Sequence, residues 1–461
     1  MGAQKRAARR ESNFSDSCRA RTQDATDQRS AVRTVGESIP NDTDFEFIRE
    51  PGTRRLCLCV FRENSCKLFR SVELHNYLSL SSGMNPSILR AITLPSKCGP
   101  LVSTPELFAT VRKSLTNRGV PEEAALPATY FVFSTWFPEC LPIAPCLSIM
   151  GPRPEAGLLL QLLGCMVRHP LPLREVTRGG LLSLPMDLQL TLLIAQEHIK
   201  GSTWRLLCAS NDRNAYVPWK GRLVNVFCSK AVYQGYESED NFDDSTLRID
   251  LWPSRGPLPI LDAKDMQEIA EELQPRLLAY RRWNIAKVRE SKFDRPEFSS
   301  GIRILARVLG ASIVDAPQIQ AALDPLLREY HEEAAAARWL DSRCVAIEAA
   351  LFHCHDGERK KTHVGKIAFT ANAILKGRGK TEQLGDKEMG TILRSLGFSP
   401  KRDKFGSAIR FEDSLRRHIH KLAARFDVAA AQAGVAMCPY CAEIVAAGAT
   451  RSQRGAVQKK A

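Results

Sequence analysis

Residues 147–163, "LSIMGPRPEAGLLLQLL", have the layout of a phosphate-binding turn between a strand and a helix. A short apolar run ends at Gly151-Pro152, Gly157 follows, and a leucine-rich stretch with helical spacing begins directly after it. Such a turn holds phosphate with backbone N–H groups, and a lysine and a hydroxyl complete the site. Both are missing here, so the stretch is either a nucleotide site that has lost its chemistry or a turn that never bound phosphate.

A second candidate site is the pair Cys438 and Cys441, which has C-x-x-C spacing near the end of the sequence. Two thiolates supply half of a tetrahedral zinc site, and no second cysteine pair follows. His418 and His420 are close in sequence but fall on a predicted helix. The pair is therefore a weak metal candidate, with a redox pair or an isolated feature of the tail as alternatives. The run "HCH" at 353–355 straddles a helix end, which turns its side chains in different directions and argues against a ligand role.

The positive charge of the chain is concentrated toward its end. Of the formal net charge of +14, most arises from residues 357–461, where 21 Lys and Arg stand against 9 Asp and Glu. A neutral body with a basic C-terminal part favours a region that faces nucleic acid. The alternative is a solvated basic surface followed by an unstructured tail.

Residues 341–425 carry the pattern of three helices, a two-stranded hairpin and a closing helix. The helices are expected at 341–356, 362–377, 385–398 and 414–428, with the hairpin at 399–413. This is the order of a winged helix-turn-helix, in which the third helix enters the major groove of DNA and the wing contacts the backbone. The candidate nucleic-acid-binding residues are Lys387, Arg394, Lys401, Arg402, Lys404 and Arg410. Lys and Arg without Asn or Gln favour phosphate contact over base recognition, and the alternative is a packing or docking module.

Strands and helices alternate between residues 145 and 252. Apolar runs predict strands in "PCLSIM", "TLLI", "NVFCSKAVYQG" and "STLRIDL", which favours an α/β fold with a mostly parallel sheet. In the helix-rich stretch that follows, Pro275 is expected to kink one helix or to divide two. Arg281, Arg282 and Arg303 are either arginines that act on a neighbouring subunit or solvated charge on a helical bundle.

The sequence is expected to divide into six parts. These are a disordered tail at 1–42, a small segment with strands and no evident chemistry at 43–102, an α/β core with a helical lead-in at 103–260, a helical segment at 261–340, a winged helix at 341–428 and a basic tail with the C-x-x-C pair at 429–461.

The order of these segments resembles the core of AAA-like P-loop ATPases. The resemblance rests on strand–GPxxxxG–helix, then "TLLIxxE", "SKAV" and "STLRIDL", and on "RSLGFSPKRDKFGSAIRF", which resembles the end of the winged helix in bacterial and phage-type primase–helicase relatives. It covers about residues 103–425. It implies a P-loop-like parallel core, a helical segment and a winged helix-turn-helix domain.

The first motif of this resemblance lacks its functional residues. In G-x-x-x-x-G-K-[ST] the lysine reaches the phosphates and the hydroxyl holds Mg²⁺. Counted from Gly151, Ala156 stands at the second glycine, Gly157 at the lysine and Leu158 at the hydroxyl. Two prolines at 152 and 154 also remove backbone donors.

The second motif is equally depleted. A carboxylate pair that positions Mg²⁺ and the attacking water would end the strand 192–194, but Ala195 and Gln196 stand there. Glu197 follows one residue later and is expected to face away from the site. The sequence therefore predicts no catalytic residue, no cofactor and no nucleotide hydrolysis at this site, while residual nucleotide binding or an unrelated α/β turn are the alternatives.

These observations favour a non-catalytic, nucleic-acid-associated scaffold whose winged helix contacts DNA or RNA and whose core binds a partner protein or another copy. The alternatives are a divergent ATPase subunit active only with a partner, and a protein-interaction adaptor without nucleic acid. No secretory signal and no apolar run of about 20 residues is present, so a cytoplasmic protein with reduced cysteines and no membrane segment is expected.

Overall fold

The computed structural model describes residues 43–50, 56–62, 65–69, 86–199, 201–235, 242–355, 360–381, 383–426, 428 and 438–441. The predicted tail at 1–42 and most of the tail at 429–461 lie outside these residues. The chain forms two compact units, residues 1–330 and 331–461, and the division lies within helix α11 (Leu323–Leu340).

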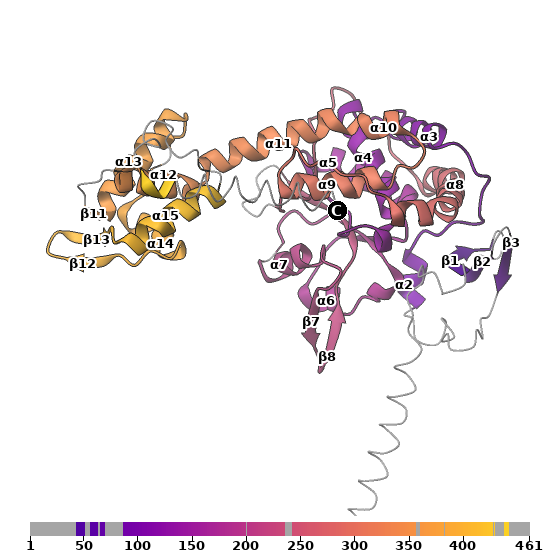
Figure 1. Cartoon of the computed structure of the whole chain (residues 1–461). Coiled ribbons are helices and arrows are strands. Elements are labelled where there is room, and N and C mark those ends of the chain that lie inside the picture. The colour runs from indigo at the N-terminus through magenta and orange to yellow at the C-terminus, as the bar shows by residue number, and fades with distance from the viewer. Residues whose placement is uncertain are drawn as a thin grey trace, which may run out of the picture. The chain divides into compact units, whose positions relative to one another are not determined.

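A five-stranded parallel sheet forms the centre of the first unit (Figure 1). Its spatial order is β10-β4-β9-β6-β5, and every neighbouring pair is parallel. The strands are β4 (Cys146–Met150), β5 (Pro170–Leu173), β6 (Thr191–Ile194), β9 (Ser229–Gly235) and β10 (Leu247–Asp250). The predicted α/β fold class with a parallel sheet is confirmed by these pairings. Four of the strands, β4, β6, β9 and β10, lie in the apolar runs from which strands were predicted.

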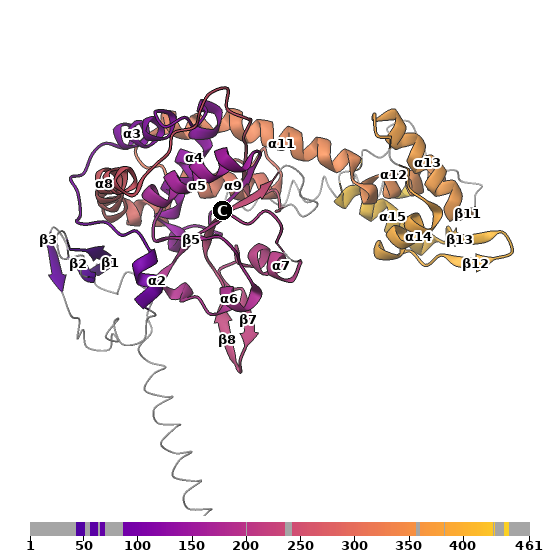
Figure 2. The ribbon, with the colours of Figure 1, turned by 180° about the vertical axis from the view of Figure 1, so that it is seen from behind.

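Helices cover both faces of this sheet, and side-chain alternation along the strands decides which residues meet which layer. Leu193 packs into the larger core, whereas its neighbours Leu192 and Ile194 pack into the second core on the opposite face. The larger core includes α3 (Thr104–Thr116), α4 (Glu122–Thr135), α5 (Arg153–Met166), α8 (Ala263–Glu290) and α9 (Ser300–Ala311). The other face is covered by α2 (Pro86–Ala91), α6 (Arg178–Leu182) and α7 (Gly201–Ala209), as the reverse view shows (Figure 2).

Shorter elements complete the first unit. An antiparallel sheet is formed by β1 (Thr43–Arg49), β2 (Leu56–Arg62) and β3 (Ser65–Phe69). A hairpin joins β7 (Tyr216–Trp219) to β8 (Arg222–Asn225), and the remaining pieces are η2 (Pro138–Cys140), η3 (Met186–Leu188) and α10 (Pro317–Ala321). Pro275 does not divide α8, which is a single helix through that position.

The second unit has its own core, to which four helices contribute. These are α12 (Ser342–His355), α13 (Val364–Gly377), α14 (Asp386–Ser395) and α15 (Asp413–Arg425). A three-stranded antiparallel sheet, in the order β11-β13-β12, lies beside them and consists of β11 (Lys361–His363), β12 (Lys401–Asp403) and β13 (Gly406–Arg410).

Candidate functional site

The carboxyl edge of the parallel sheet brings the two predicted motifs together. β4 ends at Met150 and β6 at Ile194, and β9 lies between them. Gly151 follows β4 and its N–H donates to the carbonyl oxygen of Gly235 at the end of β9 (3.1 Å). Ligands of parallel α/β sheets bind outside this edge, so the edge is the place to look for a nucleotide site.

The connection from β4 to α5 is only two residues long. Gly151 and Pro152 form it, and α5 begins at Arg153. Ala156, Gly157 and Leu158 therefore lie in the helix and not in a loop, and Leu158 is 5% exposed in the larger core. The expectation that residues 151–157 form a loop is wrong. Proline is favoured in the first turn of a helix, and Pro154 occupies that place.

The start of α5 is already surrounded by protein groups. Glu155 lies in the first helical turn, where a carboxylate complements the helix dipole, and it accepts a hydrogen bond from the N–H of Ser254 (2.7 Å). Gly151 has a φ of +120°, and a Cβ on it would lie 2.2 Å from the carbonyl oxygen of Leu251. The chain that follows β10 thus lies directly against the turn.

The side chains that follow β6 bond to nearby groups of the protein. The Gln196 amide accepts from the N–H of Val176 (2.6 Å) and donates to the carbonyl oxygen of His198 (2.8 Å). Glu197 does not face away as expected. Its Oε1 lies 3.5 Å from the hydroxyl of Tyr233, and this hydroxyl lies 3.1 Å from the carbonyl oxygen of Gly151. Because β9 ends in a glycine, the Glu197 side chain packs over Gly235 toward the β4–α5 turn.

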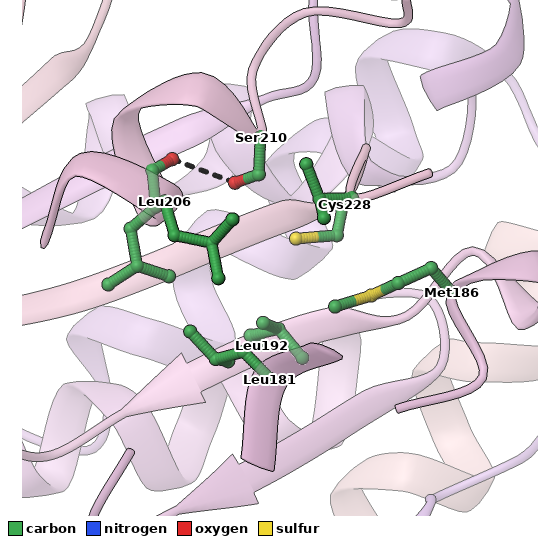
Figure 3. A pocket seen from close by; sticks show the side chains of 8 residues that line it. Leu181, Met186, Leu192, Leu206, Ser210 and Cys228 are labelled. Carbon is green, nitrogen blue, oxygen red and sulfur yellow. Dashed lines mark hydrogen bonds between the residues drawn. The ribbon is translucent and has the colours of Figure 1, made fainter. Parts of the chain in front are cut away.

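A small hollow on the other face of the sheet is apolar (Figure 3). Its lining residues are Leu181, Met186, Leu192, Leu206, Leu207, Ser210, Val226 and Cys228. The hydroxyl of Ser210 donates to the carbonyl oxygen of Leu207 (2.7 Å), so the lining presents neither a charged side chain nor an unbonded hydroxyl to a ligand.

A buried cluster of charges lies elsewhere in the first unit. Glu46 of β1 lies 2.9 Å from Nη2 of Arg168 and 2.7 Å from Nε2 of His169, and Nε of Arg281 lies 3.4 Å away. Glu139 also pairs with Arg281. Burial alone would raise the pKa of Glu46, but Arg168, His169 and Arg281 together hold this pKa well below its ordinary value. The interpretation of Arg281 as solvated charge is wrong, because this side chain is 4% exposed and neutralised by carboxylates distant in sequence.

All six predicted nucleic-acid-binding residues are exposed on the second unit. Lys387 and Arg394 lie on α14, whereas the others lie in or between β12 and β13: Lys401, Arg402, Lys404 and Arg410. The carboxylate within the hairpin, Asp403, pairs with Lys361 of β11, and this hydrogen bond lowers its pKa.

The tip of the β12–β13 hairpin also carries an aromatic side chain that the sequence interpretation missed. Phe405 is 74% exposed, and the ammonium group of Lys404 lies 4.9 Å from its ring centroid. Because α14 has two acidic residues in its first turn, Asp386 and Glu388, the excess of positive charge belongs to the hairpin and not to the helix.

The Cys438–Cys441 pair has two histidine neighbours. His355, at the end of α12, and His420, within α15, lie against the two sulfurs, and the four candidate ligand atoms are within 4.8 Å of one another. Burial lowers the pKa of both imidazoles. His418 does not join this group, because its Nε2 lies 2.8 Å from the carbonyl oxygen of Leu396.

No protein-family model and no curated protein matches this chain. Solved structures give matches of low similarity. An MCM homolog from Methanopyrus kandleri is 12% identical with a TM-score of 0.31, over 60% of this chain and 68% of that chain. The SCCmec type IV Cch helicase is 12% identical with a TM-score of 0.33, over 83% and 96%. The NrS-1 C-terminal region is 12% identical with a TM-score of 0.30, over 79% and 96%. Among the described residues, no helix combines the length and apolarity needed to cross a membrane.

Proposed function

We propose that this protein is a nucleic-acid-associated scaffold, in which residues 341–428 form a basic winged helix and a P-loop-like core carries no catalysis. The order α12, α13, α14, hairpin, α15 supports the winged helix, with β11 as the third strand of its sheet. Ile347, Ile367, Leu393 and Ile419 of the four helices pack in one core, which fixes the hairpin on a rigid support.

The observation that carries the proposal is the composition of the β12–β13 hairpin. Lys401, Arg402 and Lys404 are exposed beside Phe405, and Lys361 neutralises the acidic Asp403. Cationic side chains bind phosphates without regard to sequence, and an exposed aromatic ring stacks on a base or sugar. The hairpin is therefore the main contact, and α14 contributes through Lys387 and Arg394.

Three observations support a core without hydrolysis. The two-residue β4–α5 connection leaves no loop long enough to surround phosphates. Glu155 and Glu197 place carboxylates near the turn, where they would repel a triphosphate. Gln196 stands where a metal-binding carboxylate would be, and its side chain is hydrogen-bonded to the backbone of Val176 and His198. The position of Gly151 at the end of β4, a strand with neighbours on both sides, supports descent from a P-loop core.

The test is salt-dependent binding of the full chain to labelled duplex and single-stranded DNA and to RNA. We expect the logarithm of the affinity to fall linearly with the logarithm of the salt concentration. The double variant Arg402→Glu/Lys404→Glu is expected to lose affinity about 10-fold or more, and its slope on duplex DNA should decrease by roughly 2, since each phosphate contact contributes about 0.9.

The matched control reverses two exposed basic residues of the first unit, Arg255→Glu/Lys292→Glu, and so changes the net charge equally. Equal losses in both double variants would assign binding to the overall charge and contradict a specific role of the hairpin. If the wild-type chain binds none of the nucleic acids at low salt, the proposal fails and a protein-interaction adaptor takes its place.

A further inference from the structure

Four side chains from three separate parts of the second unit converge on one point. His355 Nε2 lies 3.1 Å from His420 Nε2 and 3.3 Å from Cys441 Sγ, and Cys438 Sγ lies 3.2 Å from His420 Nε2. His355 and His420 belong to α12 and α15, whereas the cysteines belong to the short segment 438–441. His420 and Cys441 are 3% and 4% exposed, whereas His355 and Cys438 are half-buried.

These separations match a tetrahedral metal site. With the usual Zn–N and Zn–S bond lengths, ligand atoms at the corners of a tetrahedron lie about 3.3 Å apart for two nitrogens and about 3.6 Å apart for nitrogen and sulfur. The three shortest separations, 3.1–3.3 Å, are close to these values, and all four ligand atoms lie within 4.8 Å of one another. Two imidazoles and two thiols are a common ligand set of structural zinc and poorly suited to Ca²⁺ or Mg²⁺.

The second ring nitrogen of His420 is oriented as in metal-binding histidines. Its Nδ1 lies 2.7 Å from the carbonyl oxygen of Arg416, so Nδ1–H donates and the lone pair of Nε2 points to the centre of the group. Ring packing supports the same arrangement, because the rings of His355 and Tyr440 lie 5.1 and 5.5 Å from that of His420. The hydroxyl of Tyr440 donates to Asp413 (2.9 Å), which fixes the Cys438–Cys441 segment on α15.

Neighbouring residues of the same types have other partners. The sulfur of Cys354 accepts a hydrogen bond from the guanidinium of Arg416 (3.7 Å), and Nε2 of His353 lies 3.0 Å from the hydroxyl of Thr370. Among the described residues, the ligand atoms of His355, His420, Cys438 and Cys441 form the group that lies within 4.8 Å.

We propose that His355, His420, Cys438 and Cys441 bind one structural Zn²⁺ ion that fastens the segment 438–441 to α12 and α15. The bound ion holds both sulfurs as thiolates, and with four protein ligands it has no open position for catalysis. The ion stabilises the folded state of the second unit, because the site exists only when the three parts of the chain are assembled. This inference does not depend on nucleic-acid binding.

The first test is the metal content of the purified full chain. We expect about one zinc per chain for the wild type and at least a 10-fold decrease in His420→Ala and Cys441→Ser at equal free zinc. His418→Gln and Cys344→Ala serve as controls, because they remove one histidine and one cysteine of the same unit outside the group. Equal zinc content in the ligand and control variants would overturn the proposal.

A second test needs no variant that risks misfolding. The wild-type chain, stripped of metal by a chelator under reducing conditions, is titrated with Co²⁺. A tetrahedral site with two thiolates gives strong visible bands and a near-ultraviolet sulfur-to-cobalt charge-transfer band at one equivalent, and added Zn²⁺ abolishes both. A weak, six-coordinate spectrum without the charge-transfer band would overturn the proposal.

Discussion

Glu46 is the charge on which the buried ionic cluster of the first unit depends. Replacement by Gln leaves Arg168 with a more distant carboxylate, Glu139 at 3.6 Å, and the neutral amide of Gln189, while its guanidinium stays out of water. Removing one partner of a buried pair costs about 3–5 kcal/mol, so Glu46→Gln should lower the free energy of unfolding by at least about 3 kcal/mol. Urea unfolding measures this loss. Glu268→Gln, in an exposed pair with Lys264, should cost roughly 0.5 kcal/mol or less, and similar losses in both variants would contradict the assignment.

The same carboxylate predicts how stability depends on acidity. The pKa of Glu46 is held well below its ordinary value of 4.5, so the unfolded chain takes up the proton first as the pH falls. The stability that Glu46 contributes is complete above about pH 4.5 and is lost progressively below it. The decrease in unfolding free energy between about pH 5 and pH 3 should be smaller in Glu46→Gln than in the wild type. Parallel curves for the two proteins would show that other carboxylates control the acid transition.

Single residues were the level at which the sequence predicted least. The exposed basic residues of α14 and the hairpin were identified, because charge on a solvated face is visible in the sequence itself. Glu46 was not identified, and the sequence argued against a ligand role for the run 353–355, which contains His355. The partners that give these two residues a role lie 122 and 65 residues away. A polar residue in an apolar strand, or a histidine at a helix end, carries no signal until the fold brings its partner close.

At the level of elements, two glycines that look equivalent in the sequence have different environments. Gly151 lies in the β4–α5 connection, and Gly157 lies within α5. Gly151→Ala should destabilise the protein by about 2–4 kcal/mol, because φ is +120° and the new Cβ would lie 2.2 Å from the Leu251 carbonyl oxygen. Gly157→Ala should instead stabilise it by about 0.5–1 kcal/mol, since the position is helical and no atom lies within 4 Å of the new Cβ. Urea unfolding of both variants checks this. Destabilisation by Gly157→Ala would indicate that residue 157 lies in a loop.

The elements themselves followed well from the sequence. Runs such as "TLLI" predicted buried strands because only a sheet covered on both faces accepts them. The exact connection between two elements did not follow, because the glycine spacing of 151–157 suggested a loop whereas Pro154 in the first turn and the leucines after it formed a helix. The sequence alone does not decide between loop and helix here, because the helix depends on the packing of Leu158 and its neighbours in the core.

At the scale of the whole molecule, two separately packed units predict two unfolding transitions. Different ligands should stabilise different units. Residues 1–330 and 331–461 have their own cores, so a calorimetric scan should resolve two transitions or one broadened transition. Glu46→Gln identifies the transition of the first unit, because Glu46 belongs to it. Nucleic acid and zinc should raise the other transition, since their proposed sites lie in residues 331–461.

Saturating ATP with Mg²⁺ should leave the first-unit transition unchanged. A ligand at about 100 times its dissociation constant adds about 2.7 kcal/mol to the folded state, which is readily measured as a rise in melting temperature. We expect no rise, because the helical position of Ala156–Leu158 and the carboxylates of Glu155 and Glu197 leave no place for phosphates. A rise in this transition with ATP, absent with free phosphate, would establish nucleotide binding and favour an ATPase subunit completed by a partner. Such a result would not bear on nucleic-acid binding, because the proposed site for it lies in the second unit.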